Sequence, residues 1–394
     1  MALLGTVRVR AFRSARDVEL RLGPVTALVG EARSGKSNLL SAIRTLLDPA
    51  APPRPEDLHR RASALTVEAR LTDGRRIALT ARPPEKTRTR RGGAPPVLFL
   101  PAPRRSGPLL DLDGPSDAAD EAVRSFRSAL RDPPEHRSDS VGASALVAGI
   151  DACRDARVSG VVFLIEEPEL FLRPQTQRYL YRRLRALGAD GNQVIYSTHA
   201  PAFLNVARLE ELVLVRYNAR RGTHIVQPEP LEADEAFRIV SEFDAERSEL
   251  FLARAAILVE GRTEKLVLPS IFAALGHDAD RAQISIVECG GKSNIPVFAR
   301  ICKACRIPFV VVHDRDAKQG EQPIPAEIEL NRLIASLAGR RRTIVLEPDF
   351  EGVTGLRGHS NKPERAWEHF TAPGVAVPEP LERAVRLALK DAAR

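Results

Sequence analysis

The chain has 394 residues, of which 43% are hydrophobic, enough for two or three domains with substantial cores. Its formal net charge of +8 at pH 7 favours a polyanionic partner such as nucleic acid. It has no apolar run of about 18 residues, and its first residues lack the apolar segment of a signal peptide. We therefore expect a cytoplasmic protein with no membrane contact.

The first fifty residues alternate between strand and helix patterns. Val7–Phe12 and Val18–Leu22 carry apolar residues at every second position, which predicts two strands of an antiparallel layer. The apolar run Val25–Val29 predicts a buried strand, and Leu39–Leu47 has apolar residues at helical spacing. Between these two lies Gly30–Ser37, which reads Gly-x-x-x-x-Gly-Lys-Ser. A strand, this segment and a helix in that order predict a P-loop.

The P-loop prediction assigns a role to four residues. Gly30 and Gly35 let backbone N–H groups approach phosphate oxygens at a helix N-terminus. Lys36 is expected to contact the β- and γ-phosphates of ATP, and the Ser37 hydroxyl is expected to ligate Mg²⁺. ATP and a magnesium ion are the predicted cofactors of this half of the chain.

Residues 50–135 contain fewer regular patterns. Ala64–Leu71 and Ile77–Thr80 predict a hairpin that turns at Asp73–Gly74, and Val97–Leu100 predicts a short buried strand. Residues 122–130 are compatible with a helix. Ahead of Val97 we expect a loop whose basic side chains either contact nucleic-acid phosphates or are solvated. These basic residues are Arg82, Lys86, Arg88, Arg90 and Arg91.

An apolar run that ends in acids is the second nucleotide-binding signal. Val161–Ile165 predicts a buried strand, and Glu166-Glu167-Pro168-Glu169 follows it directly, as in a Walker B motif. Glu166 is expected to hold the shell of the magnesium ion. Glu167 is expected to polarise the attacking water.

A histidine and a candidate signature segment extend this pattern toward an ABC-type ATPase. His199 follows the predicted strand Gln193–Thr198, where ABC-type ATPases place a switch histidine that senses the γ-phosphate; an isolated histidine is otherwise most often structural. Asp139–Ser144 opens a predicted helix, Ala145–Ala152, and is the candidate for the signature segment. A signature segment contacts the nucleotide of a second subunit, so we expect a homodimer or a higher homo-oligomer.

The second half of the chain carries two pairs of acids. The run Ala255–Val259 predicts a buried strand, after which two acids lie four residues apart, the second in the first turn of a predicted helix. The run Ile307–Val312 ends in two acids that are two residues apart and point to the same side of an extended chain. Carboxylates at the carboxyl ends of parallel strands suit a hard divalent cation. The four acids are Glu260, Glu264, Asp314 and Asp316.

Further residues are candidates to complete this site. Gly290 and Gly291 permit the backbone to approach closely to a phosphate or to the strand that carries the metal-binding acids, and Lys292 adds positive charge there. Residues 343–351 predict a strand on which three acids alternate, and Glu351 either completes a second metal site or is a solvated strand end. Lys362 either stabilises the pentacovalent phosphate or is a surface residue. The three alternating acids are Glu347, Asp349 and Glu351.

Two remaining features carry less information. Cys302 and Cys305 form a C-x-x-C, but no second such pair accompanies them, so small buried residues are favoured over a zinc or redox site. Residues 373–380 look extended, and Leu381–Leu389 predicts a terminal helix.

Glu-x-x-x-Glu after one strand and Asp-x-Asp after another resemble a TOPRIM domain, the metal-binding module of topoisomerases, primases and certain nucleases. With the P-loop and Walker B segments, the chain resembles the OLD (overcoming lysogenization defect) nucleases, which join an ABC-type ATPase to a TOPRIM domain. Two departures are Ala32, where ABC-type P-loops commonly have Asn, and Glu166, where Walker B usually has Asp. The resemblance is carried by Gly30–Ser37, Ile165–Glu169, Ser197–Pro201, Val259–Glu264 and Asp314–Asp316.

The resemblance implies an α/β protein in which an ABC-type P-loop ATPase head precedes a Rossmann-like TOPRIM domain with a parallel sheet. We expect the ATPase domain over residues 1–230, a helical connector over 231–253, the TOPRIM domain over 254–372 and a tail helix over 373–394. The implied activity is DNA cleavage with one or two Mg²⁺ or Mn²⁺ ions under ATP control, in phage defence or DNA processing. A helicase or another defence protein is a possible partner.

Three functional classes compete at this stage. The first is the nuclease. The second is an ATP-gated DNA-binding protein whose TOPRIM site is silent or depends on a partner. The third is a topoisomerase or primase; a topoisomerase needs a nucleophilic tyrosine, but every tyrosine lies in the ATPase half, and no template-binding module of a primase is recognisable. The tyrosines are Tyr179, Tyr181, Tyr196 and Tyr217.

Overall fold

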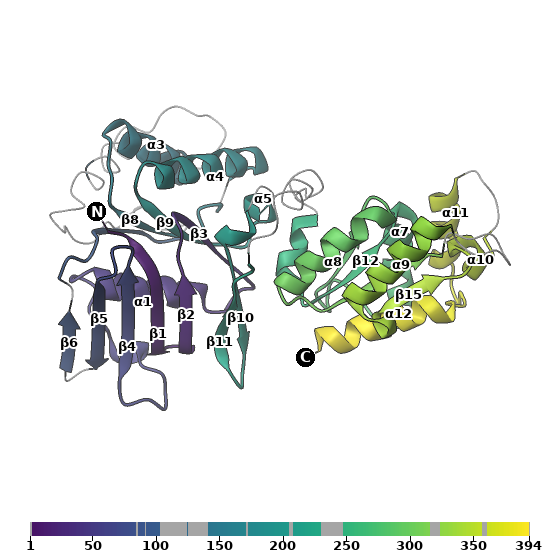
Figure 1. Cartoon of the computed structure of the whole chain (residues 1–394), viewed down its shortest axis with the longest axis horizontal. Helices are drawn as coiled ribbons and strands as arrows, with labels where there is room; N and C mark the ends of the chain where they lie inside the picture. Colours follow the sequence, from purple (N-terminus) through teal and green to yellow (C-terminus); the bar gives the residue numbers. More distant parts are fainter. Residues whose placement is uncertain are drawn as a thin grey trace. The chain divides into compact units, whose positions relative to one another are not determined.

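A computed structural model of the protein describes residues 2–83, 86–90, 92–102, 124, 141–170, 172–204, 208–229, 247–315, 324–356 and 361–393. The chain divides into two compact units, Met1–Pro230 and Leu231–Arg394. Each unit has its own sheet and its own hydrophobic core (Figure 1). Within the described residues, none of the helices is long and apolar enough to span a bilayer.

The first unit is built on a mixed sheet. Its described residues form eleven strands in the order β6-β5-β4-β1-β2-β11-β10-β3-β9-β8-β7. The β6-to-β2 part is antiparallel, whereas β10, β3, β9, β8 and β7 run parallel to one another. The strands are β1 (Leu4–Phe12), β2 (Ala15–Arg21), β3 (Val25–Val29), β4 (Leu65–Leu71), β5 (Arg76–Arg82), β6 (Lys86–Arg90), β7 (Val97–Leu100), β8 (Val162–Glu166), β9 (Gln193–Thr198), β10 (Leu212–Asn218) and β11 (Gly222–Val226).

Hydrophobic patterning explains where each strand lies. Every residue of β3 is buried, as expected for a strand with parallel neighbours on both sides and helices on both faces. On β2 burial alternates, because one face packs on the core and the other is open to solvent. The strands predicted near residues 7, 18, 25, 64, 77, 97, 161 and 193 are thereby confirmed.

Helices cover the two faces of the parallel strands. α1 (Lys36–Leu47) buries Leu39, Leu40 and Ile43 in one core cluster with residues of β1, β4 and β8. α3 (Val141–Asp155) and α4 (Pro174–Ala189) pack together on the other face, and the short α5 (Pro201–Leu204) adjoins α4 (Figure 1). The P-loop between β3 and α1 therefore lies at the carboxyl edge of the sheet.

One prediction about the first unit is wrong. The basic segment expected to be a loop contains β6, which pairs antiparallel with β5 in the register Arg82↔Lys86, Thr80↔Arg88 and Ala78↔Arg90. Threonine alternates with basic residues over Lys86–Arg90, and this period of two is compatible with a strand. Arg91 lies outside the described residues.

The second unit is a three-layer α/β fold around four parallel strands in the order β13-β12-β14-β15. The strands are β12 (Ala255–Val259), β13 (Ile284–Glu288), β14 (Phe309–Asp314) and β15 (Thr343–Leu346). A 3₁₀ helix, Arg247–Leu252, leads into β12. The helices are α7 (Arg262–Ala274), α8 (Ile295–Ala304), α9 (Pro325–Ala338), α10 (Phe350–Thr354), α11 (Lys362–Thr371) and α12 (Glu379–Ala392).

The position of β12 and β14 as neighbours has a direct consequence for the site. The two strands pair in parallel, with Val259 opposite Val312. Glu260 follows β12 and Asp314 ends β14, so both acids lie at the carboxyl edge of the same sheet. α7 and α12 contribute to the core cluster on one face of the sheet, and α8 and α9 contact the strands on the other.

The C-terminal helix α12 is part of the core of the second unit. It packs against β12, β14 and β15, and it buries Leu381, Val385 and Ala388. Asp391, 4% exposed, accepts two hydrogen bonds from the Arg342 guanidinium, one of them at 2.7 Å, next to the start of β15. A partly buried, bidentate ion pair thus joins α12 to the sheet.

We expect Asp391→Ala to lower the free energy of unfolding of the second unit by about 3 kcal/mol, because it leaves the half-buried Arg342 without its carboxylate. Glu382→Ala is the matched control: it breaks the pair with the exposed Arg386 and is expected to cost about 0.5 kcal/mol or less. Urea unfolding followed by the fluorescence of Trp367, the single tryptophan, measures both. Equal losses would show that the ion pair with Arg342 adds nothing to α12 docking.

Candidate functional site

Two P-loop glycines are packed too closely for a side chain. Gly35 precedes α1 with φ +109°, and a Cβ there would lie 2.1 Å from Thr223 Oγ1. A Cβ on Gly30 would lie 2.1 Å from the carbonyl oxygen of Val215. Val215 and Thr223 belong to β10 and β11. The sheet itself therefore holds the loop in its conformation.

Lys36 is a buried cation at the start of α1, with 5% of its surface exposed. Its ammonium donates hydrogen bonds to the carbonyl oxygens of Gly30 (2.8 Å) and Glu31 (2.9 Å). Burial lowers the pKa of Lys36 to about 8, although the carboxylates of Glu167, Glu169 and Glu31 favour its charged form. An anion such as a phosphate group would stabilise this poorly hydrated charge.

Ser37 and Glu166 line one cavity of ≈ 740 Å³. Arg13, Arg44 and Phe99 form other parts of its wall. The hydroxyl of Ser37 and the carboxylate of Glu166 are oxygen donors of the kind that Mg²⁺ takes in proteins. The donors present in this cavity therefore fit a magnesium ion next to the P-loop.

Glu167, His199 and Lys36 meet, although the sequence presents them in three separate motifs. Glu167 Oε1 lies 3.1 Å from His199 Nε2, and His199 Nδ1 lies 3.5 Å from Lys36 Nζ. Glu167 has φ +45°, a conformation that is uncommon outside glycine, and its N–H donates to the carbonyl oxygen of Ser197 at 3.0 Å. Burial lowers the pKa of His199, the Lys36 ammonium lowers it further, and Glu167 opposes the shift.

Glu169 is a site residue that sequence reasoning missed. Its side chain is 7% exposed, and its Oε1 accepts hydrogen bonds from the His199 N–H (2.7 Å) and from Thr198 Oγ1 (2.8 Å). Glu169 Oε2 is buried and has no hydrogen-bond partner among the residues that the structure describes, and burial raises the pKa of this carboxyl group. Glu169 therefore joins the Walker B segment to the backbone that carries His199. The available signal was a third acid in the predicted Glu-Glu-Pro-Glu segment.

In the second unit, backbone contacts bring the acids of two strands together. The Asp314 N–H donates to Glu260 Oε2 at 3.4 Å, and the Gly291 N–H donates to the Glu260 carbonyl oxygen at 2.9 Å. Glu264 lies in the first turn of α7 and is 5% exposed. The Phe350 N–H donates to Asp314 Oδ1 at 2.9 Å. The turn at Gly290–Gly291 thus approaches the backbone that carries Glu260.

The electrostatics of these acids show that they are crowded. Burial raises the pKa of Asp314 to about 7, and the carboxylates of Glu264 and Glu260 add to the shift. Burial likewise raises the pKa of Glu264, and Glu351 adds to it. The donor chemistry fits a divalent cation, whose charge would relieve both burial and repulsion.

Lys362 supplies a positive charge beside these acids. Its ammonium lies 2.7 Å from Glu351 Oε1, at the start of α11. Burial lowers the pKa of Lys362, but the hydrogen bond to Glu351 and the carboxylates of Glu351, Asp314 and Glu264 outweigh it, so the pKa is raised. Lys362 is therefore a charged lysine that faces the acidic cluster.

The strand expected over residues 343–351 is wrong in its second half. β15 ends at Leu346, before Pro348, which has no N–H for a sheet ladder. Asp349 instead caps α10, where its Oδ1 accepts from the Gly352 N–H at 2.7 Å, and Glu347 lies 3.4 Å from Arg315. Glu347, Asp349 and Glu351 therefore share no strand face.

The structure also places Lys292 and the two cysteines of the C-x-x-C segment. Lys292 is 5% exposed and pairs with Glu327 of α9 at 2.9 Å, so its charge is already neutralised. Cys302 and Cys305 are both fully buried, as expected for core residues. Within the described residues, no group of three or more His, Cys, Asp or Glu side chains is placed to hold a metal ion as it stands.

Several predictions fall on residues that the structure does not describe. They include Asp316, the fourth acid of the metal set. They also include Asp139 and Ser140, the start of the candidate signature segment, and α3 begins within that segment, at Val141. The helix expected over residues 122–130, apart from Arg124, and most of the connector over 231–253 lie outside the described residues as well.

Two family models match the chain. The TOPRIM domain of overcoming lysogenization defect-like proteins matches residues 251–316, and an AAA domain matches residues 120–205. With the P-loop sheet of the first unit and the parallel sheet of the second, these matches define the class of protein. It is an α/β protein that joins an ATPase head to an OLD-like TOPRIM domain, which confirms the predicted fold class.

The chain is similar to two proteins that are named OLD nucleases. The chain is 37% identical over 270 residues to the OLD nuclease of Thermus scotoductus, which covers 62% of this chain and 51% of that protein. It is 28% identical over 168 residues to the Old nuclease of Escherichia phage P2, covering 41% and 29% of the two chains. The predicted relationship to the OLD nucleases is confirmed, and the chain spans about half the length of the first relative and less of the second.

Solved structures show more distant likenesses. The SMC head domain from Thermotoga maritima has a TM-score of 0.40 and 18% identity, and covers 58% of this chain and 99% of its own. The C-terminal region of the Xanthomonas campestris pv. campestris OLD protein has a TM-score of 0.29 and 17% identity, and covers 37% of this chain and 96% of its own.

Gly35→Ala is expected to lower the stability of the first unit by more than the backbone strain of a positive φ, which is about 1–3 kcal/mol, because its Cβ also meets Thr223. Gly74→Ala, in the turn between β4 and β5, is the matched control: it has φ +86°, but a Cβ there meets nothing within 4 Å. Thermal unfolding followed by circular dichroism compares the two. If both variants lose the same stability, β11 does not constrain the P-loop.

Proposed function

We propose that the protein is a DNA endonuclease that depends on a divalent metal ion and is regulated by ATP. The observation that carries the proposal is the pairing of the buried Glu264 with the half-buried Asp314, which lie with Glu260 and Lys362 at the carboxyl edge of the second sheet. Both relatives described above are OLD nucleases. A TOPRIM family model matches residues 251–316, which include Glu264 and Asp314. The reaction would be hydrolysis of a phosphodiester bond, which nicks or cleaves DNA.

The chain's own residues would divide the work as follows. Glu260, Glu264, Asp314 and Asp316 would hold one or two Mg²⁺ or Mn²⁺ ions, with Glu351 as a candidate for the second. A bound divalent ion supplies a Lewis acid and an activated water. Lys362 would stabilise the negative charge that grows on the phosphate, for which it must exchange its contact with Glu351 for the substrate.

The first unit would bind and hydrolyse ATP. Gly30, Gly35 and Lys36 would hold the phosphates, and Ser37 and Glu166 would hold Mg²⁺. Glu167 would orient the attacking water while its contact with His199 reports the presence of the γ-phosphate. Lys36 would exchange the carbonyl oxygens of its own loop for phosphate oxygens, which removes the burial cost of its charge.

Biological setting and partners follow from the family resemblance. We place the activity in phage defence or DNA processing. A homodimer or higher homo-oligomer and a helicase or another defence partner stay predictions.

Nicking of supercoiled plasmid tests the nuclease. With Mg²⁺ or Mn²⁺, wild-type protein is expected to nick DNA, and EDTA is expected to abolish the reaction. Glu264→Gln is expected to slow nicking by about a hundredfold or more, because it removes a charged metal ligand while keeping its shape. Glu368→Gln is the matched control, because it removes one carboxylate from an exposed position on α11.

Nicking that persists in Glu264→Gln would contradict the assignment of the site. Absence of nicking with both metals, with and without ATP, would contradict the nuclease itself. A Lys36→Ala variant run beside them shows whether nucleotide regulates the reaction.

The role of Glu169 predicts a graded series in ATP hydrolysis. Glu169→Ala removes the acceptor of the His199 N–H and the Thr198 hydroxyl, so kcat is expected to fall about tenfold to a hundredfold with little change in KM for ATP. Glu169→Gln keeps a carbonyl acceptor and is expected to retain most activity. Thr198→Val removes one of the two contacts and is expected to lie between them. Equal losses for Gln and Ala would mean that the charge of Glu169, and not its placement of His199, matters.

A further inference from the structure

The outward face of β1, β2, β4 and β5 carries arginines that are neutralised unevenly. On β1, Arg8 pairs with Asp17 at 2.8 Å and with Glu19 at 3.9 Å. Arg10 pairs with Asp17 at 3.8 Å and with Glu68 at 3.9 Å. The acids of this face are thus engaged with the two arginines of β1, while α1 packs against the opposite face of the strands.

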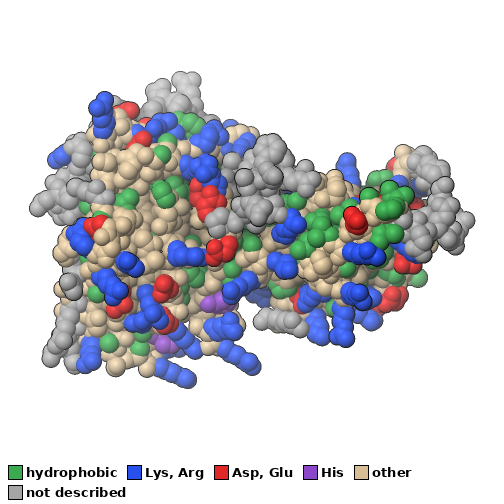
Figure 2. Space-filling view, viewed as in Figure 1, with side chains coloured by type: hydrophobic (Ala, Val, Ile, Leu, Met, Phe, Trp, Pro, Cys, Tyr) green, Lys and Arg blue, Asp and Glu red, His purple; other side chains and the backbone are tan. Residues whose placement is uncertain are grey.

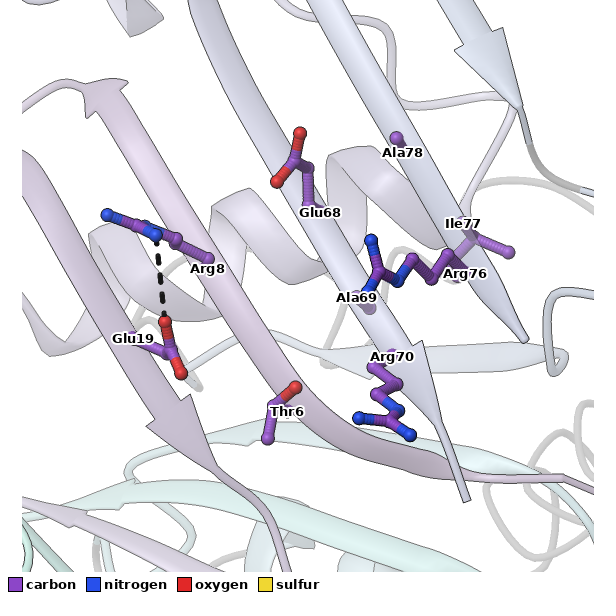
Figure 3. A pocket seen from close by; sticks show the side chains of 9 residues that line it. All are labelled: Thr6, Arg8, Glu19, Glu68, Ala69, Arg70, Arg76, Ile77 and Ala78. Atoms are coloured by element: carbon purple, nitrogen blue, oxygen red, sulfur yellow. Dashed lines mark ion pairs between the residues drawn. The ribbon is translucent and has the colours of Figure 1, made fainter. Parts of the chain in front are cut away.

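Arg70 and Arg76 have no such acidic partners among the described residues. They are directly opposite each other in the register of β4 and β5, and both side chains are exposed. Neither forms an ion pair with any part of the chain that the structure describes. Figure 3 shows both side chains beside Thr6, at a hollow of ≈ 400 Å³ whose one drawn ion pair joins Arg8 to Glu19.

Arg82, at the other end of β5, is also exposed, and it lies on the same face of the sheet as Arg76 because the two are six positions apart on one strand. Figure 2 shows that Lys and Arg side chains outnumber acidic ones over the strand layer of the first unit.

Like charges placed directly opposite on neighbouring strands destabilise a sheet. Exposed strand positions accept many residues, and threonine would pair better there than a second arginine. The fold thus gains nothing from Arg70 opposite Arg76. An anion that bridges the two guanidinium groups would turn the repulsion into a binding site.

We propose that the outward face of β4 and β5 is a docking surface for the phosphate backbone of duplex DNA, with Arg70, Arg76 and Arg82 as its phosphate contacts. The proposal rests on DNA being the substrate, as in the proposed function. Guanidinium groups bind phosphate through paired N–H donors. The segments of β4, β5 and β6 contain no aromatic residue, so the face lacks the stacking platform that single strands require.

Binding of a short fluorescein-labelled duplex, measured by fluorescence anisotropy in EDTA, tests the surface apart from cleavage. For the double variant Arg70→Gln/Arg76→Gln the Kd is expected to rise roughly tenfold to a hundredfold at about 0.1 M salt. The slope of log affinity against log salt is expected to fall by about two, one for each lost phosphate contact. Glu68→Gln, which removes an acid from the same hollow, is expected to tighten binding.

A matched control separates this surface from net charge. Arg182→Gln/Arg386→Gln removes the same charge from exposed positions on α4 and α12, and is expected to leave binding within about twofold of wild type, since neither side chain lies at this face. Basal ATP hydrolysis verifies folding in each variant. At low salt the melting temperature of Arg70→Gln/Arg76→Gln is expected to equal or exceed that of wild type, because a repulsive pair is gone. A merely structural role for the two arginines would lower it.

Each outcome decides the question. Weaker binding in Arg70→Gln/Arg76→Gln alone supports the surface. If wild type binds and nicks DNA but the two double variants behave alike, the surface is wrong and the proposed function stands. If wild type neither binds nor nicks DNA, both are wrong.

Discussion

Burial of charge at the carboxyl edge of a parallel sheet is the constraint on which both units depend. A parallel strand ends where its neighbours end, so residues that follow different strands meet at one edge. Lys36, Glu167 and His199 meet in this way in the first unit, and Glu260 and Asp314 in the second. These side chains are charged or titratable groups partly withdrawn from water, which is costly unless an opposite charge completes them. The raised pKa of Asp314 and the lowered pKa of Lys36 both reflect charge that is withdrawn from water without full compensation.

The two sheet edges carry uncompensated charge of opposite sign. At the P-loop a cation is buried against carbonyl oxygens of its own loop, and what it lacks is an anion. At the TOPRIM edge, partly or fully buried carboxylates lie close to one another, and one lysine, held by Glu351, does not balance their charge. A phosphate group suits the first and a divalent cation the second. The sign of each unmet charge follows from residue placement alone, without any reference to relatives.

Sequence predicts what is local in these sites and misses what depends on packing. The strand, glycine turn and helix around Gly30–Ser37 are contiguous, so their pattern is visible in one segment. The need for glycine at position 35 is also set by Thr223, which comes 188 positions later and shows no pattern. Glu169 bonds the backbone of His199, 30 residues on, and no spacing rule connects them. The strand predicted through Glu351 failed for a local reason, since Pro348 and the capping Asp349 already mark its end and the alternation of acids was given more weight.

The distribution of arginine shows why composition cannot substitute for placement. A net charge of +8 is compatible with a uniformly basic surface, and the basic segment around residue 88 is compatible with a solvated loop. Pairing of that segment with β5 makes it a strand, so the register of the sheet, and not the number of basic residues, decides which positions lie opposite each other. On β1 each arginine has an acid within 4 Å, so the positive charges of these arginines are compensated. Between β4 and β5 an arginine faces an arginine, and the repulsion is retained within an otherwise well-paired sheet. A local cost that the fold does not need is better explained by a bound partner than by chance composition.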